Sequence, residues 1–268
     1  MKKFFQIFYV ALMLLFIYAP IFTLVVYSFV DTPVVNIQEA VRLGFSFNLY
    51  EKLFADAALM KIVWDTLILA VIVAILATVL GVLGAIGIFY SKGKLGKGVA
   101  AASRVTVINA EIVTAVSLVL VFAMVFSESR SYFSMVVGHL AITAPFVVLS
   151  VTPKLKQMDG SLYEAALDLG ASPATALFKV VLPEILPGII SGFMMAITLS
   201  LDDYIISAYT KPAGFDTIST YVYGAMSKSS ANSSLPALRA LSAIIFIFII
   251  LVVVVQNVRA SRKKGGAK

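Results

Sequence analysis

The sequence contains no cysteine and only one histidine, His139. Without thiols the chain forms no disulfide and offers no thiol nucleophile or lipoprotein attachment site, and the redox compartment stays open. The signatures H-E-x-x-H and G-x-S-x-G are also missing, so the lone histidine lacks the partners of a metal site or a nucleophile–base pair. These absences argue against an enzyme, and we expect His139 to be satisfied by a neighbouring helix.

Charge is also scarce, because only 13% of the 268 residues are charged and 60% are hydrophobic. A soluble domain averages about a quarter charged residues, whereas the mean hydropathy here is +0.99. The composition therefore predicts an integral membrane protein with a single domain over residues 1–268. The net charge of +7 does not indicate nucleic-acid binding, because the basic residues lie between apolar runs rather than in one aromatic-interleaved patch.

Six apolar runs reach the length of about 20 residues that a bilayer crossing needs. They cover approximately residues 4–30, 62–90, 99–126, 134–151, 187–209 and 236–258. We therefore predict an all-α fold of six transmembrane helices in contact with membrane lipid. Of the 21 Lys and Arg residues, 14 lie at the N-terminus, in the 2–3 and 4–5 connections or in the C-terminal tail. The positive-inside rule then places both termini in the cytoplasm.

The cytoplasmic connection between the fourth and fifth runs, residues 152–186, has strong helix-capping signals. Ser161 with Glu164 three residues later is a capping-box pattern that predicts the start of a short helix. Gly170 can take the left-handed conformation that ends it, and Ser172 can cap a second helix that stops before the fifth run. Capping alone leaves two readings open, a compact docking knuckle or a hairpin that merely joins two spans.

A longer sequence pattern within residues 152–186 favours the docking knuckle over the simple hairpin. Glu164-Ala165-Ala166 is followed at fixed offsets by Gly170, Val180, Leu182 and Pro183. This resembles the EAA loop of ABC importer permeases, E-A-A, three residues, G, nine residues, I-x-L-P, with Val in place of Ile. The resemblance implies the type I importer (MetI-like) permease fold. It also implies a coupling helix that docks on a separate ATPase, with the roles carried by Glu164, Ala165, Ala166, Gly170, Leu182 and Pro183.

The chain lacks the G-x-x-x-x-G-K-[ST] pattern that cradles nucleotide phosphates. The stretch "SKGKLGKG" has neither the spacing nor the hydroxyl. We therefore expect no cofactor in this chain, with ATP and Mg bound by the partner ATPase.

The most unusual stretch of the fifth run is "TLSLDDYIISAY", residues 198–209, with Asp202 beside Asp203. Each Asp at the centre of a spanning helix costs about 2.5–3.5 kcal/mol on insertion scales. The pair must therefore face water, a counter-ion, a partner subunit or a cationic passenger. Neighbouring helical residues differ by about 100°, so both cannot point into one lumen. Two roles are open, in which one meets substrate while the other caps a broken helix or pairs with a partner, and the sequence does not separate them.

Much of the chain resembles the PotC-type permeases of spermidine/putrescine importers, through the stretches "YAPIFTLVVYSF", "AEIVTAVSLVLVF", "APFVVLSV" and "TLSLDDYIISAYT". The resemblance implies a polyamine importer in a bacterial cell membrane. In it this chain would pair with a second homologous permease, two copies of an ATP-binding subunit and an extracellular polyamine-binding protein.

A polyamine path needs carboxylates that balance the amines and aromatic faces that cover the methylenes. The candidates are Asp202, Asp203, Glu111, Tyr204 and Tyr209, although Glu111 could equally pair with Arg104 or cap a helix kink. Two alternatives stay open at this point. One is a permease for another organic cation, an opine-like compound or a metal complex, and the other is a non-transporting membrane anchor for an ATPase.

Overall fold

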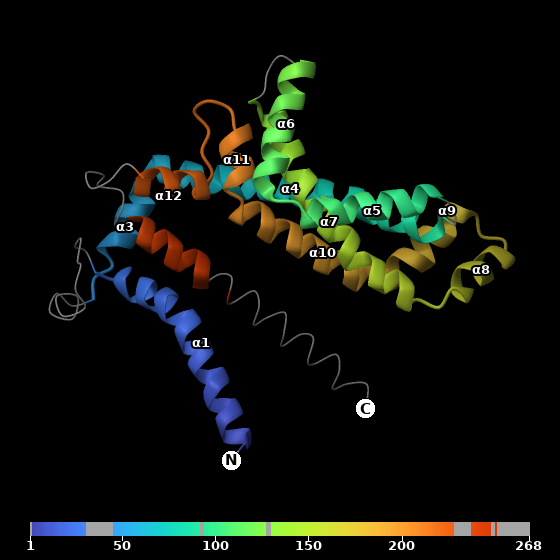
Figure 1. Ribbon diagram of the computed structural model, residues 1–268, viewed down its shortest axis with the longest axis horizontal. Coiled ribbons are helices and arrows are strands. Elements are labelled where there is room, and N and C mark those ends of the chain that lie inside the picture. The colour runs from blue at the N-terminus through green and yellow to red at the C-terminus, as the bar shows by residue number, and fades with distance from the viewer. Residues whose placement is uncertain are drawn as a thin grey trace. The chain divides into compact units, whose positions relative to one another are not determined.

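The computed structural model describes residues 2–30, 45–91, 94–126, 130–227, 237–247 and 250. Every regular element in these ranges is helical (Figure 1). The elements are α1 (Lys2–Tyr27), α3 (Asn48–Ala55), α4 (Ala57–Tyr90), α5 (Lys94–Ile108), α6 (Glu111–Phe126), α7 (Tyr132–Gln157), α8 (Ser161–Asp168), α9 (Pro173–Ala176), the π-helical η1 (Leu177–Val181), α10 (Leu182–Asp202), α11 (Ile205–Thr210), α12 (Ile218–Ser227) and a helix over Ala237–Ile247.

Four helical stretches are long and apolar enough to cross a membrane, and they are Phe5–Tyr27, Ala57–Tyr90, Tyr132–Gln157 and Pro173–Asp202. A fifth crossing results if the bent pair α5 and α6 counts as one span. The predicted run 236–258 lies mostly outside the described residues, which include its helix Ala237–Ile247 and residue 250. The described residues thus confirm an all-helical membrane protein with four or five spans, and the count of six stays a prediction.

The third predicted run, residues 99–126, is not one straight helix. It bends by 113° between α5 and α6, with Asn109 and Ala110 at the corner. The Asn109 side chain donates a hydrogen bond to the Thr114 hydroxyl over 3.3 Å. An asparagine side chain that bonds locally competes with the helical pattern, which accounts for a corner here. Glu111 becomes the first residue of α6.

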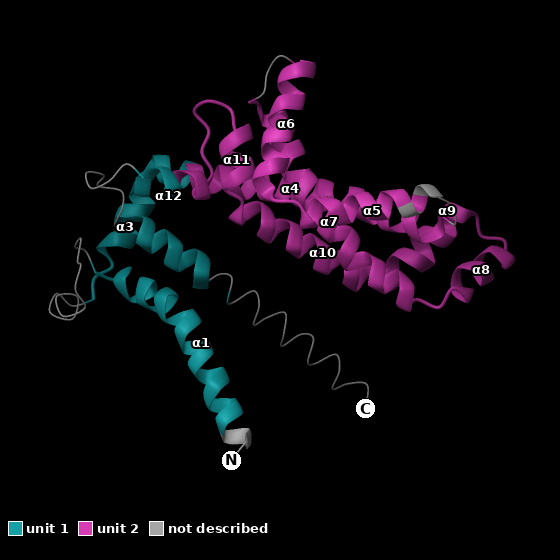
Figure 2. Ribbon diagram, viewed as in Figure 1, with its two compact units in different colours: residues 1–61, 222–268 teal, residues 62–221 magenta. Residues whose placement is uncertain are grey.

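The chain divides into two units, residues 1–61 with 222–268 and residues 62–221 (Figure 2). In the first unit the end of α1 is held against the start of α3. The Ser28 and Tyr50 hydroxyls lie 2.7 Å apart, and the Phe29 ring meets Phe45 and Phe47 edge-on. All candidate site residues belong to the second unit.

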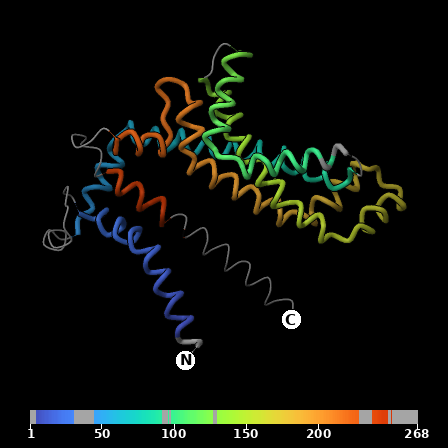
Figure 3. Tube along the Cα trace, in the orientation of Figure 1, coloured from blue at the N-terminus to red at the C-terminus, as the bar shows by residue number. Residues whose placement is uncertain are grey.

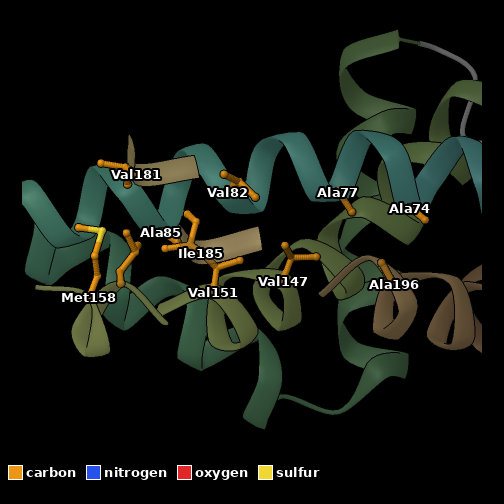
Figure 4. Close-up of a cluster of buried hydrophobic side chains, with 11 residues drawn as sticks. Ala74, Ala77, Val82, Ala85, Val147, Val151, Met158, Val181, Ile185 and Ala196 are labelled. Carbon is orange, nitrogen blue, oxygen red and sulfur yellow. The ribbon is translucent and has the colours of Figure 1, made fainter. Parts of the chain in front are cut away.

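The second unit is built on a core of small apolar side chains between α4, α7 and α10 (Figure 4). Ala74 and Ala77 of α4, Val147 of α7 and Ala196 of α10 are all fully buried. Lipid tails are as apolar as these side chains, so close van der Waals contact drives such packing, and small residues permit it.

The second helix of the knuckle does not stop near Pro183 as its proline suggests. Helix continues from Pro173 to Asp202 as α9, η1 and α10. In η1 the Leu182 N–H bonds the Leu177 carbonyl five residues back. The wider π turn explains the continuity, because Pro183 then falls at a junction where the ordinary four-residue ladder is already interrupted.

Candidate functional site

The helix that carries the adjacent aspartates breaks directly after the first of them. α10 ends at Asp202, Asp203 has an extended backbone (φ −65°, ψ 123°), and α11 begins at Ile205. The Asp203 carboxylate accepts the N–H of Ile206 at 3.1 Å and the N–H of Ser207 at 2.8 Å. These are donors that a helix start leaves unpaired, so Asp203 caps α11.

The break gives the two carboxylates opposite environments. Asp203 is only 6% exposed, whereas Asp202 is exposed. The structure thus separates two residues that the sequence left equivalent, with one aspartate turned into the protein and the other out of it.

The buried partner of Asp203 is the lone histidine. His139 of α7 has no exposed surface, and its Nε2 lies 3.5 Å from Asp203 Oδ2. Its ring nitrogens also lie 3.0 Å from two hydroxyls, Nδ1 from Ser200 of α10 and Nε2 from Ser207 of α11. The expectation that a neighbouring helix satisfies His139 is confirmed. Ser200 and Ser207 were not predicted as its partners, because they are about 60 residues away in the sequence and come from two different helices.

Glu111 stands close to the break through packing of α6 on α11 and α7. It is exposed, lies in the first turn of α6 where a negative charge suits the helix dipole, and is repelled by the charges of Asp203 and Asp202. Three carboxylates therefore gather where α5 meets α6 and α10 meets α11.

The two candidate tyrosines are placed differently. Tyr204 lies in the break and is partly exposed. Tyr209 packs against an apolar cluster of Ala115, Ile142 and Ile206. Tyr204 thus follows Asp203 directly and lies two residues after the exposed Asp202, and Tyr209 contributes to the packing of α11.

The predicted docking knuckle lies at the far end of the second unit from α11 (Figures 1 and 3). Gly170 follows α8 with a φ of +85°, as predicted. Ser172 caps α9 by accepting the Thr175 N–H, also as predicted. The start of α8 differs, because its N-cap residue is Gly160 and the predicted capping box does not form. Asp159 instead accepts the Ser161 N–H at 3.0 Å.

The knuckle is anchored on one side and bare on the other. Tyr163, Leu177 and Leu182 pack against the core of the second unit. Leu162, Leu169 and Phe178 are 43%, 89% and 66% exposed. Of the residues of the E-A-A pattern, Glu164 and Ala165 are exposed and Ala166 is half-buried. The knuckle therefore presents an apolar surface from a fixed position.

Among the described residues, no group of three or more His, Asp or Glu side chains is arranged to hold a metal ion.

Three comparisons bear on these observations. The model of the family described as binding-protein-dependent transport system inner membrane component matches residues 77–263. The chain is 31% identical over 232 residues to the putrescine transport system permease protein PotI of Escherichia coli K12, covering 84% of this chain and 81% of PotI. It is 31% identical over 198 residues to the spermidine/putrescine transport system permease protein PotC of Haemophilus influenzae, covering 74% of this chain and 76% of PotC.

Among solved structures, a chain of the MetNI methionine ABC transporter in an inward-facing conformation superposes with a TM-score of 0.61 at 21% identity. The match covers 75% of this chain and 94% of that one. At this identity the likeness concerns the fold, and it agrees with the MetI-like arrangement expected from the E-A-A pattern.

Proposed function

Because the chain belongs to the family of binding-protein-dependent transport system inner membrane components, we propose that it is the permease subunit of an ATP-driven importer for polyamines such as spermidine and putrescine. The observation that carries the proposal is the exposed Asp202 at the break of an apolar spanning helix, with Glu111 nearby. Ionisable residues at membrane depth are rare and mark substrate pathways.

The chemistry of the break suits a flexible polycation. Asp202 and Glu111 are exposed carboxylates that repel each other, and a passing ammonium group relieves that repulsion. Tyr204, two residues after Asp202 and partly exposed, supplies an aromatic ring at the break, and ammonium groups are attracted to aromatic faces by about 0.5–2 kcal/mol. PotI and PotC are both named for transport of polyamines.

The energy for transport comes from elsewhere in this proposal. The exposed apolar side of the knuckle, with Leu169 at its edge, docks on a partner ATPase that holds ATP and Mg. Glu164, Ala165, Ala166, Gly170, Leu182 and Pro183 form or support that contact. The full assembly contains a second homologous permease, two ATP-binding subunits and an extracellular polyamine-binding protein. It lies in a bacterial cell membrane with both termini of this chain in the cytoplasm.

The test is uptake of labelled spermidine and putrescine by cells that lack other polyamine importers and express the whole cognate complex. We expect Asp202→Asn to assemble but to lose at least about 90% of uptake, because a central charge contact contributes more than 1.4 kcal/mol. Glu164→Ala should lose uptake by weakening the contact with the ATPase. Membrane abundance and ATPase association of each variant are the controls.

An assembled wild-type complex that imports no polyamine would overturn the substrate assignment. Uptake of another organic cation, an opine-like compound or a metal complex would then identify the passenger. Absence of any substrate-stimulated ATP hydrolysis would instead indicate a non-transporting anchor.

A further inference from the structure

The chain's one histidine joins the two sides of the break. Ser200 lies on α10 just before it, and Ser207 lies on α11 just after it. Both hydroxyls lie 3.0 Å from the His139 ring, on opposite nitrogens. A single rigid ring on α7 therefore bridges both segments of the broken helix.

The charges around the ring fix its hydrogen bonds. Nε2 lies 3.0 Å from the Ser207 hydroxyl and 3.5 Å from the Asp203 carboxylate. A nitrogen that faces a carboxylate carries a proton, so Nε2 donates to Ser207. In the neutral ring Nδ1 is then the acceptor, and the Ser200 hydroxyl donates to it.

The same cluster fixes the first turn of α11. The Ser207 N–H donates to Asp203, and the Ser207 side chain bonds His139. The other Asp203 oxygen accepts the Ile206 N–H. Both carboxylate oxygens are therefore bonded to the backbone of α11, and these bonds hold the side chain inside the protein. Removing one partner leaves the rest buried and unpaired, which costs more than the bond itself contributes.

We propose that His139 is a positioning residue, which clamps the break so that Asp203 stays inside as a cap and Asp202 stays outside on the substrate path. The inference rests on the proposed role of Asp202 in transport. It gives the adjacent carboxylates different tasks, with Asp202 meeting the amine and Asp203 fixing the helix geometry that presents Asp202.

A double-mutant cycle tests whether His139 acts through Asp202. Spermidine uptake per assembled complex is measured at saturating binding protein for wild type, His139→Leu, Asp202→Asn and the double variant. We expect each single change to lower uptake between about tenfold and a hundredfold, because misplacing a binding group by about 1 Å has effects of that size. The double variant should be no slower than Asp202→Asn alone. Losses that multiply would contradict the positioning role.

Conservative variants and a matched control sharpen the cycle. A glutamine amide reaches the place of Nε2, and an asparagine amide reaches the place of Nδ1. His139→Gln should therefore restore more uptake than His139→Asn, since Nε2 faces both Ser207 and Asp203. Thr143→Val removes a buried hydroxyl one turn along α7 that donates to the backbone carbonyl of His139 and not to its ring, and it should leave uptake within about twofold of wild type. If His139→Leu fails to assemble, His139→Gln and His139→Asn take its place in the cycle.

Hydrogen exchange tests the clamp without substrate. In the lipid-embedded complex, amides of residues 205–210 should exchange about five- to thirtyfold faster in His139→Leu than in wild type, the effect of losing a helix cap. Thr143→Val should match wild type. Unchanged exchange in His139→Leu would overturn the clamp. If the wild-type complex imports no polyamine, but residues 205–210 still exchange faster in His139→Leu than in wild type, the proposed function is overturned and the clamp stands.

Discussion

A single exposed carboxylate, that of Asp159, lies at the start of the first helix of the knuckle, α8. Asp159 accepts the Ser161 N–H at 3.0 Å. Hydrogen bonds from the backbone and side chain of Ser161 lower the pKa of Asp159 below its ordinary value of 3.8. A carboxyl with a lowered pKa in the folded protein stabilises it above the unfolded pKa, and the contribution is lost as the pH falls through the folded value.

We predict that Asp159→Asn loosens the start of α8 near neutral pH but has no effect in acid. A neutral amide accepts a weaker hydrogen bond than a carboxylate, so the peptide around Ser161 should exchange its amide hydrogens a few-fold faster in the variant. Variant and wild type are compared at each pH, which cancels the intrinsic dependence of exchange. A ratio that stays constant from neutral pH down to about pH 2 would contradict the role given to the charge.

Asp202 and Asp203 were named from the sequence, together with the option that one of them caps a broken helix, but which of the two does so was not predicted, and neither was their link to His139. The cost of charge in a membrane identified Asp202 and Asp203 as exceptional, and the scarcity of histidine made His139 conspicuous. Their division of roles follows from a break in the helix that has neither proline nor glycine to announce it. The neighbouring residues alone do not reveal this break, because the local cap by Asp203 is supported by bonds from His139 of α7, about 60 residues away.

At the scale of elements, the packing of α11 on α7 depends on a missing side chain. A Cβ built on Gly138 would lie 2.5 Å from the Ile206 Cγ2. Ile206 is fully buried and follows directly from the capped start of α11. Gly138 therefore lets α11 approach α7 closely enough for His139 to reach Ser207.

We predict that Gly138→Ala destabilises the assembled protein by about 1–3 kcal/mol, the usual cost of overpacking. Gly87→Ala in α4 is the matched control, because no atom lies within 4 Å of the added Cβ, and alanine in a helix is favoured over glycine by about 0.5–1 kcal/mol. Thermal unfolding of both variants in the same lipid measures the difference. Equal stability of the two variants would show that α11 moves aside without cost. It would contradict the inference that α11 packs against α7 only because residue 138 is a glycine.

Helices were easier to predict than their corners. The apolar run 62–90 became part of α4, and the signals of Gly170 and Ser172 matched the observed turn and cap. A kink near Glu111 was left open, but the sharp corner at Asn109 and the continuation through Pro183 were not predicted, for opposite reasons. An asparagine is a weak breaker that wins here through a side-chain bond, and a proline is a strong breaker that a π turn accommodates.

On the scale of the second unit, one continuous stretch of helix connects the knuckle to the break. It runs over 30 residues from Pro173 to Asp202, which corresponds to about 45 Å at 1.5 Å per residue. A packed helix transmits displacement with little loss, so motion of a docked ATPase at α8 and α9 would reach the position of Asp202. The proposed contact with the ATPase and the proposed substrate path thus lie at opposite ends of the same helical stretch.

The proposed orientation requires these two ends to lie on opposite sides of the membrane. The loop 211–217 sits at the start of α7, where Phe215 meets the Tyr132 ring, and α8 follows the end of α7. The 26 residues of α7 span about 39 Å, which exceeds the hydrocarbon thickness of about 30 Å. The absence of native cysteine makes single-cysteine labelling clean. Ala213→Cys and Asp168→Cys both replace exposed side chains.

We predict that a membrane-impermeant thiol reagent labels Ala213→Cys on intact cells and labels Asp168→Cys only after the membrane is opened. The unaltered chain provides the background, because it has no thiol to react. Uptake by both variants confirms that they are assembled. Labelling of Asp168→Cys in intact cells would place the knuckle outside, beyond the reach of a cytoplasmic ATPase. The proposed energy coupling would then fail even if Asp202 still met a polyamine.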